Sequence, residues 1–495
     1  MSNLTHSKKF QTPEMKVPII FHGAEYSLVK EDLLKQLIEV AKNPLLFHHL
    51  SLLSEVHSKK GSRLPAGTIA ASSNYLLPQL IDTAPNCGMR MLITNLEKSE
   101  VTPEKVEELF KKLRAAVPSK KLTGTTIPLK VALEIFRQGS KALIDYSPLR
   151  IKNELENTFN KGNMFSGLDK DDYPSIRDIR NIIPSFILKL ASRRLGILGA
   201  TSSHFIYLMK VNQIFDTDIA QKFNLSAEKY IIFMHTGSGI VGRLIASLYT
   251  PIEDMKFLNK LTLSISQILF DSQLKKVFKH LRKKLKLVAK ERELFAYEDQ
   301  SIEGRMFIAA HCAASNYGFA NRAIISHLID EIMEQVFQRR IETALLYDAP
   351  HVYIKKEKHF GKEVWVHRNG ANRALGPTAM KNHYLFSQTG EPVFVAPLEN
   401  TLAYLGVGTD QNELSFFSAN HEFGKATEIN LSPFAQSPSI ETKEYSFDVY
   451  TRQRKITEKQ NKIYQNYAQK TIEELEKKQI IKPVASFKPI AKLTY

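Results

Sequence analysis

Short apolar runs bounded by turn-forming residues restrict the fold of this chain more than any other feature. Residues 230–234, for example, form a compact run of β-branched and aromatic side chains, and glycines follow at positions 237 and 239. Such runs are typical of buried strands. No apolar run approaches the roughly 20 residues that a membrane-spanning helix needs. The sequence therefore predicts several buried strands and no contact with a membrane.

Helical periods mark other parts of the chain. Residues 31–41 repeat apolar side chains at helical spacing. Thr102, Pro103 and Glu104 have the residue order of a helix start, which predicts a helix to about residue 117. Longer helices are predicted at about residues 303–340 and 455–478. No Gly/Ser-rich or Pro-rich linker and no repeat divides the 495 residues. We therefore predict one large α/β (α+β) domain of mixed sheets with helical insertions.

The charge of the chain points to a polyanionic partner. Lys and Arg number 68 against 51 Asp and Glu, which gives a formal net charge of +17. Such an excess favours a polyanionic partner, either nucleic acid or an anionic membrane, although a generally lysine-rich surface has the same composition. Of the two, nucleic acid is the partner that we expect. Residues 275–292 are the most basic stretch and have an amphipathic pattern, so they predict either a solvated helix face or an RNA contact.

The cysteine content and the first residues predict the compartment. Two cysteines cannot build a disulfide framework, and their separation in sequence favours reduced thiols. Residues 1–16 are polar and lack the apolar segment of a secretory signal. We therefore expect a cytoplasmic protein.

One cysteine and three histidines lie at similar places in the pattern. Cys87 is set among turn-forming residues, and His204, His235 and His351 each stand at the end of an apolar run. A thiolate and three imidazoles together would make a soft, nitrogen-rich metal site. Taken singly, each residue is more simply explained as a buried free cysteine or a hydrogen-bonded loop histidine. Local pattern alone leaves open whether the four belong together.

The order of several short motifs resembles the RtcB family of GTP-dependent RNA ligases, over about residues 55–490. The matching stretches, with the family patterns that they resemble, are residues 57–67 (His-x-Gly-Lys-Gly), 87–89 (Asp-x-Gly-Cys-Gly-Met), 196–205 (Gly-Gly-Gly-Asn-His-Phe), 235–238 (His-Ser-Gly-Ser-Arg), 316–322 (Asn-Phe-Ala-Trp-Ala-Asn-Arg), 347–351, 367–373 and 418–425 (Ser-x-x-His-Gly-Ala-Gly-Arg). The resemblance implies an RtcB-like ligase domain at residues 56–495, with a basic helical insertion near 270–295. A divergent N-terminal segment, residues 1–55, would precede it.

This resemblance implies an activity. The enzyme would join RNA 3′-phosphate or 2′,3′-cyclic phosphate ends to 5′-hydroxyl ends, in RNA repair or tRNA splicing. His421 would be the nucleophile that takes GMP from GTP. RNA would be the partner of the protein, as tRNA halves or broken ends, with an archease-type activator as a further one.

The resemblance also implies a ligand set. Cys87 would bridge two manganese ions, with His204 on one ion and His235 plus His351 on the other. The nucleotide contacts would be Ser203, Tyr207, Glu399, Lys425 and Lys488.

Several family positions carry different residues here. Ala84 stands where the metal loop has its aspartate, so one of the two metals would keep only the cysteine and one histidine as protein ligands. Asp82 lies two residues away. Gly239 replaces an arginine that would clamp phosphate, and residues 396–400 replace a Pro-Gly-Ser-Met-Gly nucleotide loop.

Two further changes flank the expected nucleophile. Glu422 and Phe423 replace Gly-Ala directly after His421. We expect these two side chains to crowd and charge the place where a phosphate would approach. The chain is therefore a divergent member by its sequence.

Three functions remain open. The leading one is a GTP- and manganese-dependent RNA ligase. The alternative is a catalytically impaired RtcB-like RNA-binding protein, because the nucleotide loops are rebuilt. The third is a phosphoesterase that uses a metal at Cys87, His235 and His351, although the site has few carboxylates for such chemistry.

Overall fold

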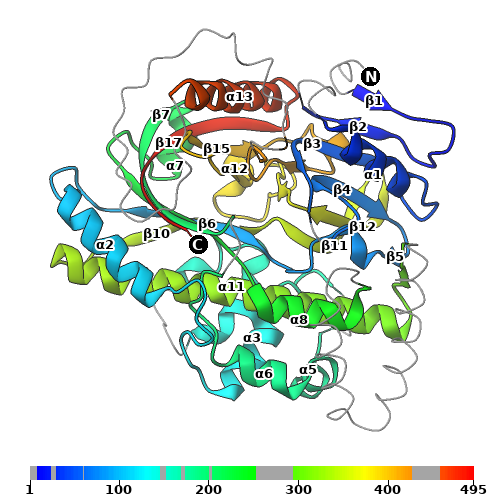
Figure 1. The fold of residues 1–495 in the computed structure, drawn as a ribbon, viewed down its shortest axis with the longest axis horizontal. Coiled ribbons are helices and arrows are strands. Elements are labelled where there is room, and N and C mark those ends of the chain that lie inside the picture. The colour runs from blue at the N-terminus through cyan, green and yellow to red at the C-terminus, as the bar shows by residue number, and fades with distance from the viewer. Residues whose placement is uncertain are drawn as a thin grey trace.

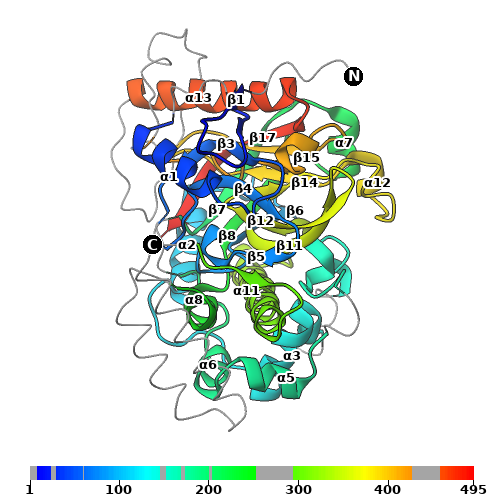
Figure 2. The same cartoon turned by 90° about the vertical axis from the view of Figure 1, so that its right-hand side faces the viewer.

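The protein is described by a computed structural model that covers residues 8–23, 29–59, 61–144, 152–168, 173–199, 203–251, 294–425, 428 and 458–494. Two large sheets occupy the upper half of the molecule, and the long helix α11 (Ile302–Phe337) crosses beneath them (Figure 1). A quarter turn shows that α3, α5, α6 and α8 lie on the same side as α11, below the sheets (Figure 2). The predicted basic insertion near 270–295 falls almost wholly on residues 252–293, outside the described residues.

The larger sheet carries the part of the fold that positions the site. In the described part of the chain it has seven strands in the order β10-β6-β8-β7-β17-β15-β14, and neighbouring strands pair antiparallel. Its strands are β6 (Gly88–Thr94), β7 (Phe205–Ile214), β8 (Tyr230–Thr236), β10 (Thr343–Pro350), β14 (Pro392–Val395), β15 (Ala403–Gly408) and β17 (Ile481–Thr494). Most of their side chains are buried, which explains why they appear in the sequence as continuous apolar runs.

The second sheet joins the start of the chain to its middle. Among the described strands its order is β1-β2-β3-β4-β12-β11. These strands are β1 (Lys8–Phe10), β2 (Ile19–Phe21), β3 (Leu50–His57), β4 (Ala66–Ser72), β11 (Val352–His359) and β12 (Lys362–Asn369). Two short pairs complete the strand pairing described, namely β5 (Tyr75–Leu76) with β9 (Tyr297–Glu298) and β13 (Asn372–Arg373) with β16 (Ser418–Ala419).

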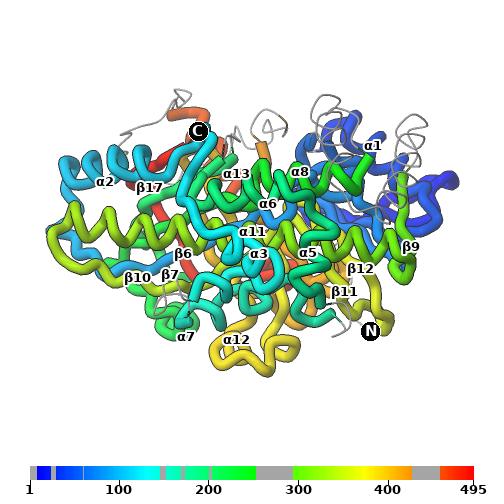
Figure 3. The backbone as a smooth tube through the Cα atoms, turned by 90° about the horizontal axis from the view of Figure 1, so that it is seen from below, coloured from blue at the N-terminus to red at the C-terminus, as the bar shows by residue number. Residues whose placement is uncertain are grey.

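Helix α11 is buried along most of its length. It contains no proline and is rich in alanine, a residue with high helix propensity and a small side chain. Seen from below, α11 runs along the molecule with α2 and α8 beside it (Figure 3). The other helices are α1 (Glu31–Ala41), α2 (Pro103–Ala116), α3 (Leu129–Gln138), α5 (Ile176–Ile182), α6 (Ser185–Ala191), α7 (Thr217–Lys222), α8 (Gly239–Tyr249), α12 (Phe386–Thr389) and α13 (Glu458–Lys477).

Most of the predicted elements are confirmed. The helix at residues 31–41 is α1, and Thr102 caps α2, since its side chain accepts a hydrogen bond from the Lys105 N–H. The long charged helix is α13, and β8 continues two residues beyond the predicted strand. The predicted α/β class with one mixed domain is confirmed, while the boundary between residues 55 and 56 stays a prediction. Within the described residues, no helix has the length and apolar character needed to cross a bilayer.

Candidate active site

The register of the larger sheet brings four strand ends to one edge. Gly88, at the start of β6, lies opposite Pro350 at the end of β10 and opposite Thr236 at the end of β8. Phe205, the first residue of β7, lies opposite His235. The residues next to these ends are therefore held within a few ångströms of one another, although they come from distant parts of the chain.

The cysteine and histidines predicted as metal ligands meet at this edge. The Cys87 Sγ lies 3.3 Å from the His204 Nε2 and 3.1 Å from the His235 Nε2. The His235 Nε2 lies 3.2 Å from the His351 Nε2. The ligand atoms of Cys87, His204 and His235 all lie within 4.8 Å of one another. The structure thus brings together the four residues that the sequence left as separate candidates.

Backbone carbonyls fix the orientation of two of these imidazoles. The Nδ1 of His204 lies 2.6 Å from the carbonyl oxygen of Leu198, and the Nδ1 of His235 lies 2.6 Å from that of Ser203. Because a carbonyl only accepts hydrogen bonds, each Nδ1 must carry the proton. Each Nε2 then presents a lone pair toward Cys87. Histidine ligands of metals are commonly held in this way, so the residues fit a divalent cation.

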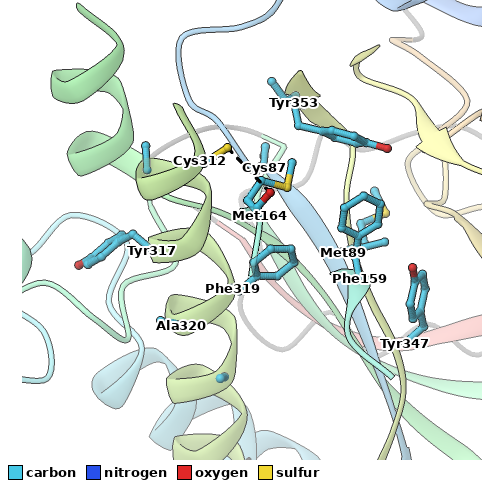
Figure 4. Close-up of a cluster of buried hydrophobic side chains, with 14 of the residues drawn as sticks. Cys87, Met89, Phe159, Met164, Cys312, Tyr317, Phe319, Ala320, Tyr347 and Tyr353 are labelled. Atoms are coloured by element: carbon cyan, nitrogen blue, oxygen red, sulfur yellow. Dashed lines mark hydrogen bonds between the residues drawn. The ribbon is translucent and has the colours of Figure 1, made fainter. Parts of the chain in front are cut away.

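Burial keeps these groups neutral in the absence of a cation. Cys87 belongs to a buried apolar cluster that also includes Met164 and residues of α11 (Figure 4). Burial raises the pKa of the Cys87 thiol to about 11 and lowers the pKa of His204 to about 4. The pKa values of His235 and His351 also lie well below the ordinary value, mainly because of burial. A cation could therefore bind without displacing a positive charge from these four groups.

His421 lies against the same cluster, on the loop after β16. Its ring centroid is 4.2 Å from that of His351. Its Nδ1 lies 2.7 Å from the Oε2 of Glu55, a fully buried residue of β3. The same carboxylate accepts hydrogen bonds from the backbone N–H groups of His421 and Glu422. Glu55 thus holds both the ring and the backbone of His421.

Two carboxylates flank the ring of His421. Burial disfavours the imidazolium, but Glu55 and Glu422 more than offset it and raise the pKa of His421. The Glu422 Oε2 lies 3.8 Å from the His421 Nε2, and the Glu422 Oε1 lies 3.6 Å from the His57 Nε2. The prediction that Glu422 charges this place is thus in accord with its position.

The expectation that Phe423 crowds the same place is wrong. Phe423 is fully buried and packs on Tyr404, at 5.9 Å between ring centroids, in a separate apolar cluster. Its large apolar side chain packs within that cluster, and among the described residues its ring contact is with Tyr404. Glu422 alone of the two substituted residues lies against His421.

Two glycines allow the close packing of the Cys87 loop. A Cβ on Gly237 would clash with the carbonyl oxygen of Asn86 and lie 2.7 Å from the Cα of Cys87. A Cβ on Gly318, in α11, would lie 2.8 Å from the same carbonyl oxygen. The loop is therefore held between the end of β8 and the central helix, at distances that leave no room for side chains.

A single buried guanidinium ties the loops of the site together. Arg322, in α11, donates hydrogen bonds to the carbonyl oxygens of Asn86, at 3.1 Å, and Thr236, at 2.9 Å. Its Nε donates to the Oδ1 of Asp348, at 2.8 Å, and Asp348 also accepts from Arg90. Asn86 precedes the cysteine, Thr236 follows the second histidine, and Asp348 lies three residues before the third. Arg322 therefore anchors three of the four loops of the cluster.

The residues predicted to contact nucleotide lie at different distances from this centre. The Ser203 carbonyl reaches His235, and the Lys425 Nζ donates to the carbonyl oxygen of Ser58, next to His57. Tyr207 is buried among apolar side chains of β7, beside Phe205. Glu399 lies in the turn before β15 with φ at 52°, and Lys488 pairs in register with Lys210 in the sheet. Their nucleotide roles stay predictions.

Sequence reasoning missed two residues of the site. Glu55 was not singled out, although it is the one carboxylate in the fully buried strand β3, and a buried carboxylate requires a partner. Lys59 was seen only as part of a basic loop. Its Nζ lies 3.2 Å from the Oδ2 of Asp82, close to the cysteine loop.

Fold and site together define a mixed α/β protein with a buried thiol–imidazole cluster suited to a metal, beside a histidine held by a carboxylate. The family model described as tRNA-splicing ligase RtcB matches residues 36–494, so the chain belongs to the RtcB family.

Curated relatives agree with this membership. The tRNA-splicing ligase RtcB of Methanococcus maripaludis is 28% identical over 438 residues, which is 83% of this chain and 80% of the relative. The protein of the same name from Thermococcus kodakarensis is 27% identical over 79% of this chain and 76% of its own length. That of Nanoarchaeum equitans is 25% identical over 83% and 81%, respectively.

Replacement of Arg322 by methionine tests the anchoring role of the guanidinium. Removing one partner of a buried ion pair costs about 3–5 kcal/mol, because the remaining charge and the two carbonyl groups lose their donor. We expect a loss of that size in the free energy of unfolding, measured by chemical denaturation. Arg340→Met, at an exposed position, is the matched control and should change stability by less than about 0.5 kcal/mol. Equal stability of the two variants would contradict the anchoring role.

Proposed function

We propose that this protein is a GTP- and manganese-dependent RNA ligase that joins 3′-phosphate or 2′,3′-cyclic phosphate ends to 5′-hydroxyl ends through a GMP–histidine intermediate. The observation that carries the proposal is the position of His421. Its ring lies beside the thiol–imidazole cluster, and its Nδ1 lies 2.7 Å from Glu55. Membership of a family of tRNA-splicing ligases supports the same activity.

The chemistry follows from the two nitrogens of His421. The attacking form is the neutral imidazole, whose Nδ1 lies beside Glu55 and whose Nε2 lone pair attacks the α-phosphorus of GTP. Because Glu55 and Glu422 raise the pKa of His421, the Nε2 proton must leave before this attack. The Nε2–phosphorus bond forms as the bond to pyrophosphate breaks. A 2′,3′-cyclic phosphate end must first be opened by water to a 3′-phosphate. An oxygen of the 3′-phosphate then attacks the phosphorus on His421, and the Nε2–phosphorus bond breaks as GMP passes to the RNA. Attack by the 5′-hydroxyl forms the new phosphodiester and releases GMP.

Cys87, His204, His235 and His351 would hold the metal next to His421. A bound divalent cation would neutralise phosphate charge during the attack. Manganese is the ion that family resemblance implies, although sulfur and nitrogen ligands also suit zinc. Ser203, Tyr207, Glu399, Lys425 and Lys488 are the proposed nucleotide contacts.

The partner would be RNA. A net charge of +17 suits binding to a phosphate backbone, with an affinity that falls as salt rises. The names of the relatives point to tRNA halves as one substrate. An archease-type activator and a cytoplasmic location complete the proposal.

The first test detects the covalent nucleotide. Purified protein, incubated with manganese and GTP labelled at the α-phosphate, should yield a labelled band, because His421 retains the α-phosphorus. His421→Ala should yield none. The His383→Ala variant is a matched control. His383 contacts the carbonyl oxygen of Glu156, outside the site, so this variant should be labelled as the wild type is.

Ligation of RNA ends is measured in the same preparations. Product should form with the wild type and the control and not with His421→Ala. RNA binding without any label or ligated product would instead identify a catalytically impaired RNA-binding member. Label that persists in His421→Ala would move the nucleophile elsewhere.

A second test concerns Glu55. Glu55→Gln keeps the size of the side chain but removes the negative charge at the Nδ1 of His421. We expect the rate of GMP transfer to fall by about 10- to 100-fold, as when an orienting partner of a functional histidine is lost. Glu107→Gln, on the exposed face of α2, should leave the rate unchanged. An unchanged rate for Glu55→Gln, in a variant that unfolds at the wild-type temperature, would rule out this role.

A further inference from the structure

The loop that follows β3 places a lysine against the segment that carries Asp82, five residues before Cys87. The Lys59 Nζ lies 3.2 Å from the Asp82 Oδ2, and the lysine side chain is 23% exposed. The two loops pack against each other, since a Cβ on Gly61 would lie 3.2 Å from the Cγ2 of Thr83. Lys59 is therefore held between loops and is not a free surface side chain.

An asparagine of β12 fixes the relative position of these loops. The Asp82 N–H donates to the Oδ1 of Asn369, at 2.9 Å. The Nδ2 of Asn369 donates to the carbonyl oxygens of Leu64, at 2.8 Å, and Pro65, at 3.1 Å. One buried amide thus connects the segment after Lys59 to the segment that carries Asp82.

The positive charge of Lys59 acts electrostatically on the residues of the cluster. That charge acts on the pKa of each of the following residues: Cys87, His204, His235, His351 and His421. It is also an electrostatic partner of Glu422. One positive charge therefore already lies beside the neutral cluster, on the side of Asp82.

The donors that a second ion would need are lacking on that side. Ala84 has no ligating side chain, and the carboxylate of Asp82 is paired with Lys59. In the described part of the chain, Cys87, His204 and His235 form the one group of three donors whose ligand atoms lie close enough to share an ion. These residues fit one metal ion and do not fit a bridged pair.

We infer that the protein holds a single metal ion at Cys87, His204 and His235, and that the Lys59 ammonium, paired with Asp82, occupies the place of a second cation. The inference rests on the proposed metal site and departs from the two-ion arrangement that family resemblance implied. The His351 Nε2 lies 3.2 Å from that of His235, so His351 would stand beside the same ion. Lys59 supplies a fixed charge near His421 that does not depend on metal concentration.

The experiment counts ions on the full-length chain. Protein freed of metal with a chelator is dialysed against Mn²⁺, and the bound ion is measured by elemental analysis and electron paramagnetic resonance. We expect one ion per chain, with the spectrum of an isolated Mn²⁺, in the wild type and in Lys59→Arg. The double variant Lys59→Gly with Ala84→Asp is expected to bind two ions with the spectrum of an exchange-coupled pair.

Single-ligand variants distinguish a shared ion from two ions. In the inferred site, His204→Ala and His235→Ala each lower the affinity for the one ion by more than about 100-fold. This loss exceeds the about 10–100-fold that is typical when a residue hydrogen-bonded to a ligand is removed. If two ions were present, His204→Ala would leave one of them bound. This measurement stands even if the double variant does not fold.

The other outcomes overturn the inference. Two ions on the wild type would refute it while leaving the proposed ligase intact. One ion on a folded double variant would show that Lys59 and Ala84 do not determine how many metal ions the protein binds. No ion on the wild type would refute both this inference and the metal part of the proposed function, whereas the GMP label on His421 is read separately.

Discussion

The buried pair of Arg322 and Asp348 is the interaction on which the rest of the site depends. Both side chains are fully buried, and Arg90 and Glu154 extend the pair into a network of alternating charge. Desolvating such charges is costly, so the network persists only where geometry satisfies each donor. The guanidinium of Arg322 uses its remaining N–H groups on the backbone of two loops. The buried charge of Arg322 is therefore compensated only when these two loops, which carry Cys87 and His235, are in their observed positions.

This link explains how a cluster can form from residues so far apart in sequence. The apolar runs predicted the strands correctly, because burial on both faces leaves a local signal in the sequence. The same runs do not show which strand pairs with which. The order β10-β6-β8-β7 joins segments from the first, second and third quarters of the chain, and its register decides that Gly88 meets both Pro350 and Thr236. Pairing of this kind is a long-range property.

The site was therefore predictable in part. Cys87 and the histidines were identifiable as candidates since each interrupts an apolar pattern at a turn, and the order of motifs grouped them. Glu55 was missed, because it stands between polar residues of its strand, Ser54 and His57, and an acidic residue in such a stretch looks like an exposed position. The sequence could not show that Phe423 turns into a separate core while its neighbour Glu422 stays at the site. That outcome depends on Tyr404, which comes from another strand.

The charges around the site are arranged so that the cluster stays neutral until a cation arrives. Glu55 faces His421, and Lys59 faces Asp82, while the thiol and the three imidazoles carry no charge at neutral pH, because burial shifts their pKa values in that direction. A buried cluster of this kind can fold without metal at little electrostatic cost. Binding of a cation would then expel the thiol proton, since the thiolate is the ligand. Because this proton leaves, the site would gain less positive charge than the ion carries. The carboxylates of Glu55 and Glu422, on the two sides of His421, could balance part of that charge.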